Sequence, residues 1–139
     1  MVLQAPVDLD EHLLKQAESR CAKYSNLHPI LGNAMDLPKQ INEPIDYVLI
    51  ANTFHGVPNK TELSRVANDV LKEGGRFTII NWHKRPREET PVLDLPRGPN
   101  TKLRMTPNDV QLIVEPVGFE LDEVVEVGPY HYASIFVKK

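Results

Sequence analysis

The chain has 139 residues, of which 41% are hydrophobic and 25% charged, the composition of one globular domain with a single core. Its net charge of −3 argues against nucleic acid as the main partner, because phosphate-binding proteins usually carry a basic excess. No apolar run approaches the roughly 18 residues that span a bilayer, and we expect no signal peptide. Cys21 has no second cysteine to pair with, which fits a reducing compartment. We therefore expect a cytoplasmic protein.

The first third of the chain alternates strand and helix patterns. The apolar run that ends at Asp8 predicts a short strand. Asp10 is a good N-cap for a helix over residues 11–24, where apolar side chains recur at helical spacing. Residues 29–32 predict a second short strand, and residues 33–37 form the loop after it.

The middle of the chain gives the strongest pattern. A near-continuous apolar run over residues 44–51 predicts a strand buried on both faces of a parallel sheet. In the helix that follows, Asn59 can cap the start, and Gly74 stands where a left-handed residue would end it. The apolar face of this helix consists of Leu63, Val66, Ala67, Val70 and Leu71. Residues 76–82 then return to a strand pattern.

The charged stretch over residues 84–104 contains four prolines and shows neither helical nor strand periodicity. Aperiodic stretches of this length inside a compact domain are usually functional loops or disordered segments. We therefore expect a long loop or lid within a single domain that covers residues 1–139.

The C-terminal part of the chain predicts one helix and two strands. Thr106 is a capping residue, Pro107 takes the first helical position, and Asp109 supplies an acid at the third. Residues 120–127 and 131–138 are strand-like and joined by a short turn, which predicts an antiparallel pair.

This order of strands and helices predicts an α/β fold. Such a fold has an open, mostly parallel sheet with right-handed crossovers and helices on both faces. Ligands bind beyond the carboxyl ends of its strands. Those ends are residues 8–10, 33–35, 51–55 and 81–84.

Several short segments follow one another in an informative order. They are Val7-Asp8-Leu9-Asp10-Glu11-His12-Leu13-Leu14, Gly32-Asn33-Ala34-Met35-Asp36-Leu37-Pro38, Ile45-Asp46-Tyr47-Val48 with Asn52-Thr53-Phe54-His55, Val70-Leu71-Lys72-Glu73-Gly74-Gly75-Arg76-Phe77, and Met105-Thr106-Pro107 through Val117-Gly118-Phe119-Glu120. In this order the chain resembles class I S-adenosylmethionine-dependent methyltransferases of the small-molecule kind, related to ubiquinone and menaquinone methyltransferases. The resemblance implies a Rossmann-like α/β/α sandwich with a C-terminal antiparallel strand pair, and methyl transfer to a small-molecule acceptor.

The resemblance also implies a binding site for S-adenosylmethionine. Its cofactor-binding residues would be Asp8, Leu9, Asn33, Ala34, Met35, Ala51 and Asn52. The Asp8 carboxylate would accept hydrogen bonds from both ribose hydroxyls. The side-chain oxygen of Asn33, which replaces an acid of the family, would accept one from the adenine amino group. Without a cofactor, Asp8 would be a solvated acid before a helix and Asn33 a turn residue.

Methyl transfer is an in-line displacement that needs proximity and orientation more than a dedicated acid or base, so no catalytic residue is assigned. Candidate substrate contacts are His55, Trp82 and His83. His55 could equally pack as a partly buried histidine. His83 with Lys84 and Arg85 could meet an acidic substrate or form a solvated basic loop. The five histidines and one cysteine lack metal-ligand spacing, so we expect no metal site.

One family feature has no counterpart: all seven glycines lie at Gly32 or later, so the first strand with its Gly-x-Gly-x-Gly loop is missing. We therefore expect a fold truncated at its N-terminus, with two exposed strand edges. The two strands could close on each other, another copy of the chain could cover them in a homo-oligomer, or the sequence could be part of a longer protein. Besides a methyltransferase, the chain could then be a non-catalytic module with a binding or assembly role.

Overall fold

The computed structural model describes residues 3–139, which fall into two compact units. The first unit ends at Asn42, and the second covers Glu43–Lys139. Among the described residues, no helix has the length and apolar character needed to cross a membrane.

The first unit is built on a short pair of parallel strands. Its elements are β1 (Val7–Asp8), α1 (Glu11–Arg20), β2 (Ile30–Leu31), the 3-10 helix η1 (Ala34–Asp36) and α2 (Leu37–Gln40). In the pair, Val7 lies opposite Ile30 and Asp8 opposite Leu31. The predicted cap of α1 is confirmed, because the Asp10 carboxylate accepts the His12 N–H at 2.8 Å.

The helix α1 ends at Arg20, four residues before the predicted end. The Tyr24 N–H donates to Cys21 O, a tighter bond than that of an α-helix. Tyr24 is 57% exposed, so no core contact holds this last turn in helical form.

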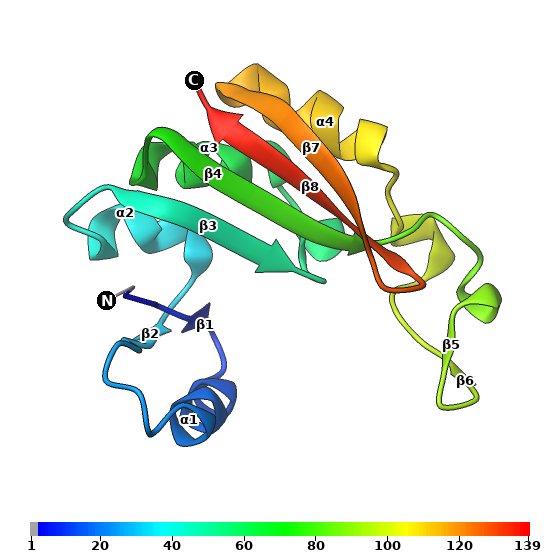
Figure 1. The fold of residues 1–139 in the computed structure, drawn as a ribbon, viewed down its shortest axis with the longest axis horizontal. Coiled ribbons are helices and arrows are strands. Elements are labelled where there is room, and N and C mark those ends of the chain that lie inside the picture. Colours follow the sequence, from blue (N-terminus) through cyan, green and yellow to red (C-terminus); the bar gives the residue numbers. More distant parts are fainter. Residues whose placement is uncertain (1–2) are drawn as a thin grey trace. The chain divides into compact units, whose positions relative to one another are not determined.

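The second unit contains a four-stranded mixed sheet in the order β3-β4-β8-β7. Its main elements are β3 (Ile45–Ala51), the 3-10 helix η2 (Phe54–Gly56), α3 (Lys60–Val70), β4 (Leu71–Trp82), α4 (Pro107–Val114), the 3-10 helix η5 (Glu115–Val117), β7 (Phe119–Val127) and β8 (His131–Lys138) (Figure 1). Strands β3 and β4 are parallel, and β8 is antiparallel to both β4 and β7. The predicted α/β fold with a C-terminal antiparallel pair is confirmed.

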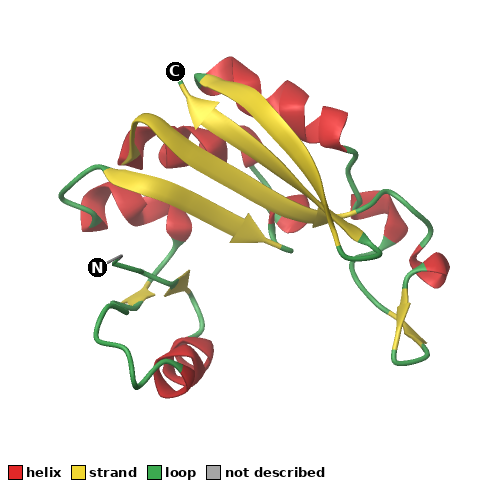
Figure 2. Cartoon of the chain, viewed as in Figure 1, coloured by secondary structure: helices red, strands yellow, loops and turns green. Residues whose placement is uncertain are grey.

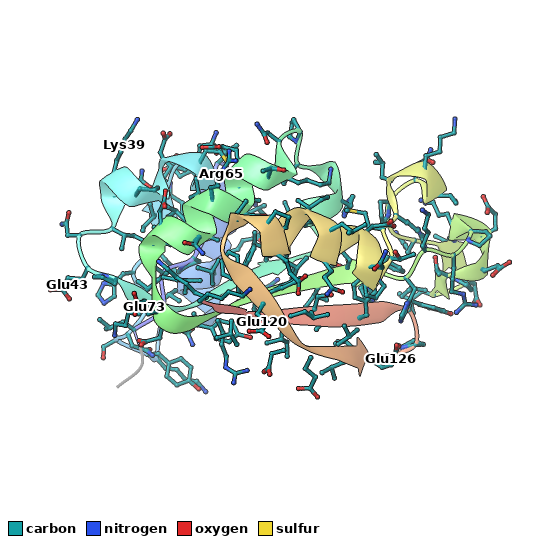
Figure 3. All side chains as sticks on the ribbon, turned by 90° about the horizontal axis from the view of Figure 1, so that it is seen from above. Lys39, Glu43, Arg65, Glu73, Glu120 and Glu126 are labelled. Atoms are coloured by element: carbon teal, nitrogen blue, oxygen red, sulfur yellow. The ribbon has the colours of Figure 1, made fainter. Side chains whose placement is uncertain are left out.

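The core of the second unit lies between this sheet and the helices α3 and α4, which cover the same face of it (Figures 1 and 3). Phe77 on β4 lies opposite Phe136 on β8, and the Phe77 and Phe119 rings are 5.4 Å apart. All three rings are fully buried. From α3, the predicted face supplies Leu63, Val66, Ala67 and Val70.

The prediction that residues 44–51 are buried on both faces is wrong. Within the second unit, β3 is an edge strand that pairs with β4 alone. Tyr47 is 49% exposed and Leu49 is 56% exposed. These side chains point to the face of the sheet opposite α3 and α4, so the apolar run is only half buried.

The helix α3 ends at Val70 and not at Gly74 as predicted. Leu71 is already extended and lies opposite Ile45, and the regular pairing with β3 resumes only at Arg76. Gly74 has a positive φ of 74° in the intervening bulge. Leu71 is almost fully buried, so its packing turns the chain into β4 before the glycine is reached.

The predicted loop over residues 84–104 holds short elements that its sequence pattern did not indicate (Figure 2). They are the 3-10 helices η3 (Arg87–Glu89) and η4 (Thr101–Leu103) and the two-residue strands β5 (Pro91–Val92) and β6 (Leu95–Pro96). Leu93 and Asp94 join these strands with φ values of 53° and 62°. Strands this short are too brief to show an alternating pattern.

The capping box of α4 gives a test of local stability. Thr106 Oγ1 accepts the Asp109 N–H at 3.1 Å, and the Asp109 carboxylate accepts the Thr106 N–H at 2.8 Å. Thr106→Ala should lower the free energy of unfolding by about 1 kcal/mol, the usual cost of a lost cap. Urea denaturation measures this. Thr61→Ala, in the first turn of α3, is the control and should change stability by less than half as much.

Candidate functional site

In the first unit, Asp8 lies at the carboxyl end of β1. Its Oδ1 accepts the Asp10 N–H at 2.9 Å, which orders the turn into α1. Asp8 is half-buried, and the adjoining Leu9 is 73% exposed. A partly accessible carboxylate therefore stands beside an exposed apolar side chain at this strand end.

Asn33, Ala34 and Met35 follow the carboxyl end of β2. Asn33 Oδ1 accepts the Met35 N–H at 3.0 Å and caps η1, as the turn interpretation of this residue predicts. The Gly32 N–H donates to Asp8 O at 3.0 Å. Since β1 and β2 are parallel, the structure brings the predicted ribose and adenine residues to the same end of the first unit.

The other predicted cofactor residues, Ala51 and Asn52, belong to the second unit. Ala51 ends β3, and Asn52 takes a left-handed conformation with a φ of 58°. The Asn52 N–H donates to Ile80 O at 2.9 Å, which holds the end of β3 against β4. A non-glycine residue with positive φ at a strand exit often marks a functional loop.

Trp82 and His83, two of the predicted substrate contacts, have structural partners at the end of β4. The Trp82 ring lies 4.2 Å from the His131 ring and stacks on Tyr130 at 6.1 Å. His83 Nε2 lies 2.7 Å from a carboxylate oxygen of Glu126, a residue labelled on β7 in Figure 3. These contacts join β4 to the C-terminal strand pair.

His55, the third predicted contact, lines a pocket of about 340 Å³ at the carboxyl ends of β3 and β4. We call it the basic pocket; it is lined by His55, Lys60, Lys84, Lys102, Leu103, Arg104, Met105, Asp109 and Ile113. Its walls come from η2, the start of α3, the segment after β4, the residues 102–105 that lead to α4, and α4 itself. Trp82 and His83 are not among these wall residues.

Arg104 is the buried charge behind the basic pocket, with 2% of its surface exposed. Its Nη2 donates to Thr90 Oγ1 and to Arg97 O, both at 3.0 Å, and its Nε donates to Pro99 O at 3.2 Å. Its guanidinium lies 5.2 Å from the Trp82 ring centroid. Burial, followed by the neighbouring Arg87, lowers the pKa of Arg104.

The surroundings of His55 favour the neutral form of its imidazole. Burial lowers its pKa below the ordinary 6.5, and the charges of Lys60 and Arg104 lower it further. Its Nδ1 is buried and has no hydrogen-bond partner among the described residues. An unpaired ring nitrogen beside a pocket can take a hydrogen bond or a proton from a ligand.

The sequence singled out His55 and Lys84 but missed Lys60, Lys102 and Arg104. Lys60 stands on an apparently ordinary helix start, and Lys102 and Arg104 fall in the aperiodic stretch. The one signal present was the excess of basic residues over residues 84–104, where six lysines and arginines face three acids in a chain of net charge −3.

The charge of Lys60 gives a test of the His55 environment. Lys60→Gln should raise the pKa of His55 toward 6.5, because one of the causes of its lowering is removed. NMR titration of the imidazole measures the pKa. Lys72→Gln, which removes an exposed lysine paired with Asp46, should leave the pKa of His55 unchanged.

The same lowered pKa predicts how stability depends on pH. In the unaltered chain, the free energy of unfolding should fall as the pH drops below 6.5, since the unfolded histidine takes up a proton before the folded one.

Comparison with known proteins adds the following findings. A family model described as a methyltransferase domain matches residues 5–109. Demethylmenaquinone methyltransferases from Staphylococcus carnosus and Lysinibacillus sphaericus are 38% and 30% identical over 74 residues. Those residues make up 53% of this chain but only 30% and 31% of the two enzymes, so the matched stretch spans under a third of each relative.

Solved structures share the fold over almost the full chain. A putative type 11 methyltransferase from Sulfolobus solfataricus has a TM-score of 0.75 and 23% identity, covering 99% of this chain and 72% of that one. A SAM-dependent methyltransferase from Aquifex aeolicus has a TM-score of 0.78 and 23% identity, covering 97% and 68%.

Proposed function

The chain belongs to the methyltransferase domain family and has the class I fold of S-adenosylmethionine-dependent enzymes. We propose that it transfers a methyl group from S-adenosylmethionine to a small-molecule acceptor. The family match over residues 5–109 carries this proposal, because it contains all seven predicted cofactor-binding residues. The similar relatives are named demethylmenaquinone methyltransferases, so the acceptor in their names is a small molecule. The cytoplasm is the proposed location.

The residues of the first unit fit the nucleoside part of the cofactor. The half-buried Asp8 carboxylate can accept hydrogen bonds from ribose hydroxyls, because only one bond to its Oδ1 is used within the turn. The Asn33 oxygen has a second lone pair beside the bond to Met35 N–H, and it is available to an adenine amino group. The exposed Leu9 offers apolar surface next to Asp8.

When bound, the cofactor supplies an activated methyl group on a sulfonium. The chain then has to hold the acceptor in line with that group. An acceptor oxygen or nitrogen that gains a methyl group loses a proton. His55 is a candidate for receiving it, since its lowered pKa favours the neutral ring and its Nδ1 has no partner among the described residues.

Binding of S-adenosylhomocysteine, the demethylated cofactor, tests the proposed function. Calorimetry should detect saturable binding. Asp8→Asn should weaken it about tenfold or more, the range for losing a charge-assisted bidentate contact, because an amide keeps the turn bond but not the charge. Asp69→Asn, an exposed acid on α3, should leave the affinity unchanged. No heat at millimolar ligand would rule out methyl transfer by this polypeptide alone.

A second candidate function is a non-catalytic module with a binding or assembly role. It is favoured by the local bonds of Asp8 and Asn33, which account for both residues without a ligand. Such a module would fold stably without cofactor. In such a module the exposed apolar side chains of β3 would be buried against a partner, and we propose that this partner is a second copy of the chain.

The oligomeric state tests that second candidate. Sedimentation should find a species of twice 15.8 kDa. Leu49→Lys should dissociate it, because a charge on an edge strand opposes pairing with another chain. Leu112→Lys, at another exposed leucine on α4, is the control and should remain dimeric. A well-folded monomer for the unaltered chain would contradict the homo-oligomer.

A further inference from the structure

The basic pocket concentrates positive charge in a chain that is negative as a whole. Four of its wall residues are cationic, Lys60, Lys84, Lys102 and Arg104, and only Asp109 is acidic. The chain as a whole carries a net charge of −3. A solvated surface of this chain would be expected to carry more acids than bases, so the imbalance is local to the pocket.

The charges inside the basic pocket are poorly neutralised. Among residues 3–139, one of these four cations forms an ion pair: Lys84 Nζ lies 3.6 Å from the Asp109 carboxylate. That carboxylate also accepts the Thr106 N–H, which commits it to the cap of α4. Lys60 Nζ donates to a neutral acceptor, Val57 O, at 2.9 Å. Most of the positive charge therefore lacks a counter-ion.

Arg104 is the second, independent sign of a ligand. The partners of its Nε and Nη2 are carbonyl and hydroxyl oxygens, all of them neutral. Its Nη1 is buried with no partner among the described residues. Glu88 favours the charge of Arg104 from a distance, but no carboxylate forms an ion pair with it among the described residues. A buried cation without such a pair is costly, and a neighbouring anion would offset that cost. Arg104 and His55 line the same pocket, and the charge of Arg104 lowers the pKa of His55.

Two helices add to the same potential. Lys60 is the first residue of α3, and Asp109 belongs to the first turn of α4, so the N-terminal ends of both helices border the pocket. Helix N-termini carry a partial positive charge that favours anions. The Asn59 side chain caps α3 through one bond, to the Glu62 N–H. This contribution strengthens a site that the side chains already define.

We propose that the basic pocket is a binding site for the carboxylate or phosphate group of a small-molecule anion. A volume of about 340 Å³ suits a small molecule. The pocket lies beyond the carboxyl ends of β3 and β4, where α/β folds bind ligands. That the anion is the methyl acceptor rests on the proposed function, whereas the binding site itself does not.

The test uses inorganic phosphate, glycerol phosphate and succinate, each titrated into the full chain with chloride keeping the ionic strength constant. NMR should show saturable shifts of the His55 ring and of the amides over residues 102–105 with at least one of these anions. A stronger response to both phosphates than to succinate would assign a phosphate group, and the reverse a carboxylate. Shifts that are absent or do not saturate would overturn the site.

Variants separate a site from general charge attraction. Lys102→Gln should weaken anion binding by about threefold to tenfold, the range for one partly exposed charge pair with a hydrogen bond. Lys72→Gln, with the same loss of charge in the same unit, should leave it unchanged. Equal weakening by both variants would overturn the site. Arg104→Gln, checked for folding by its NMR spectrum, should weaken binding at least as much as Lys102→Gln.

The same samples distinguish this site from the proposed function. Chains that bind S-adenosylhomocysteine but no anion would keep the methyltransferase proposal and remove the anion site. Chains that bind an anion but no S-adenosylhomocysteine would keep the site and remove methyl transfer by this polypeptide.

Discussion

The parallel pairing of β3 with β4 is the constraint on which the second unit depends. Because both strands run the same way, their carboxyl ends meet at one edge, and the chain leaves this edge twice. The first exit carries His55, and the second carries Lys84. An antiparallel pairing would send these two side chains to opposite ends of the sheet, and the basic pocket could not form.

Arg104 organises the rest of that edge. Its bonds to Thr90, Arg97 and Pro99 fold an aperiodic stretch against the end of β4, where its guanidinium also covers the Trp82 ring. The same side chain thus orders the loop and supplies positive charge to the pocket beside it. Local structure and electrostatics are therefore linked through one residue, which explains how a segment rich in proline and charge can be part of a defined site.

The sequence predicted the elements whose signals are local. The caps Asp10, Asn59 and Thr106 were identified correctly, because a side-chain oxygen bonding a nearby N–H needs no tertiary contact. The predictions from sequence were wrong where tertiary packing determines the structure. The burial of Leu71 sets the end of α3, and the neighbours of β3 set how far its side chains are exposed.

The candidate site was predictable in part for the same reason. His55 was found because strand exits can be located from the pattern, and Lys84 because it follows a predicted strand. Arg104 could not be found, since its importance comes from burial against Trp82 and from backbone carbonyls of its own loop. No spacing in the sequence encodes those contacts.

Trp82 is the only tryptophan of the chain, and it lies where β4, the turn before β8 and the loop around Gly98 and Arg104 meet. Gly98 approaches the indole so closely that an added Cβ would stand 2.7 Å from it. The fluorescence of this one ring therefore reports whether the 84–104 segment is seated on the sheet. The fold therefore carries an intrinsic fluorescent probe beside Arg104, and no label has to be attached.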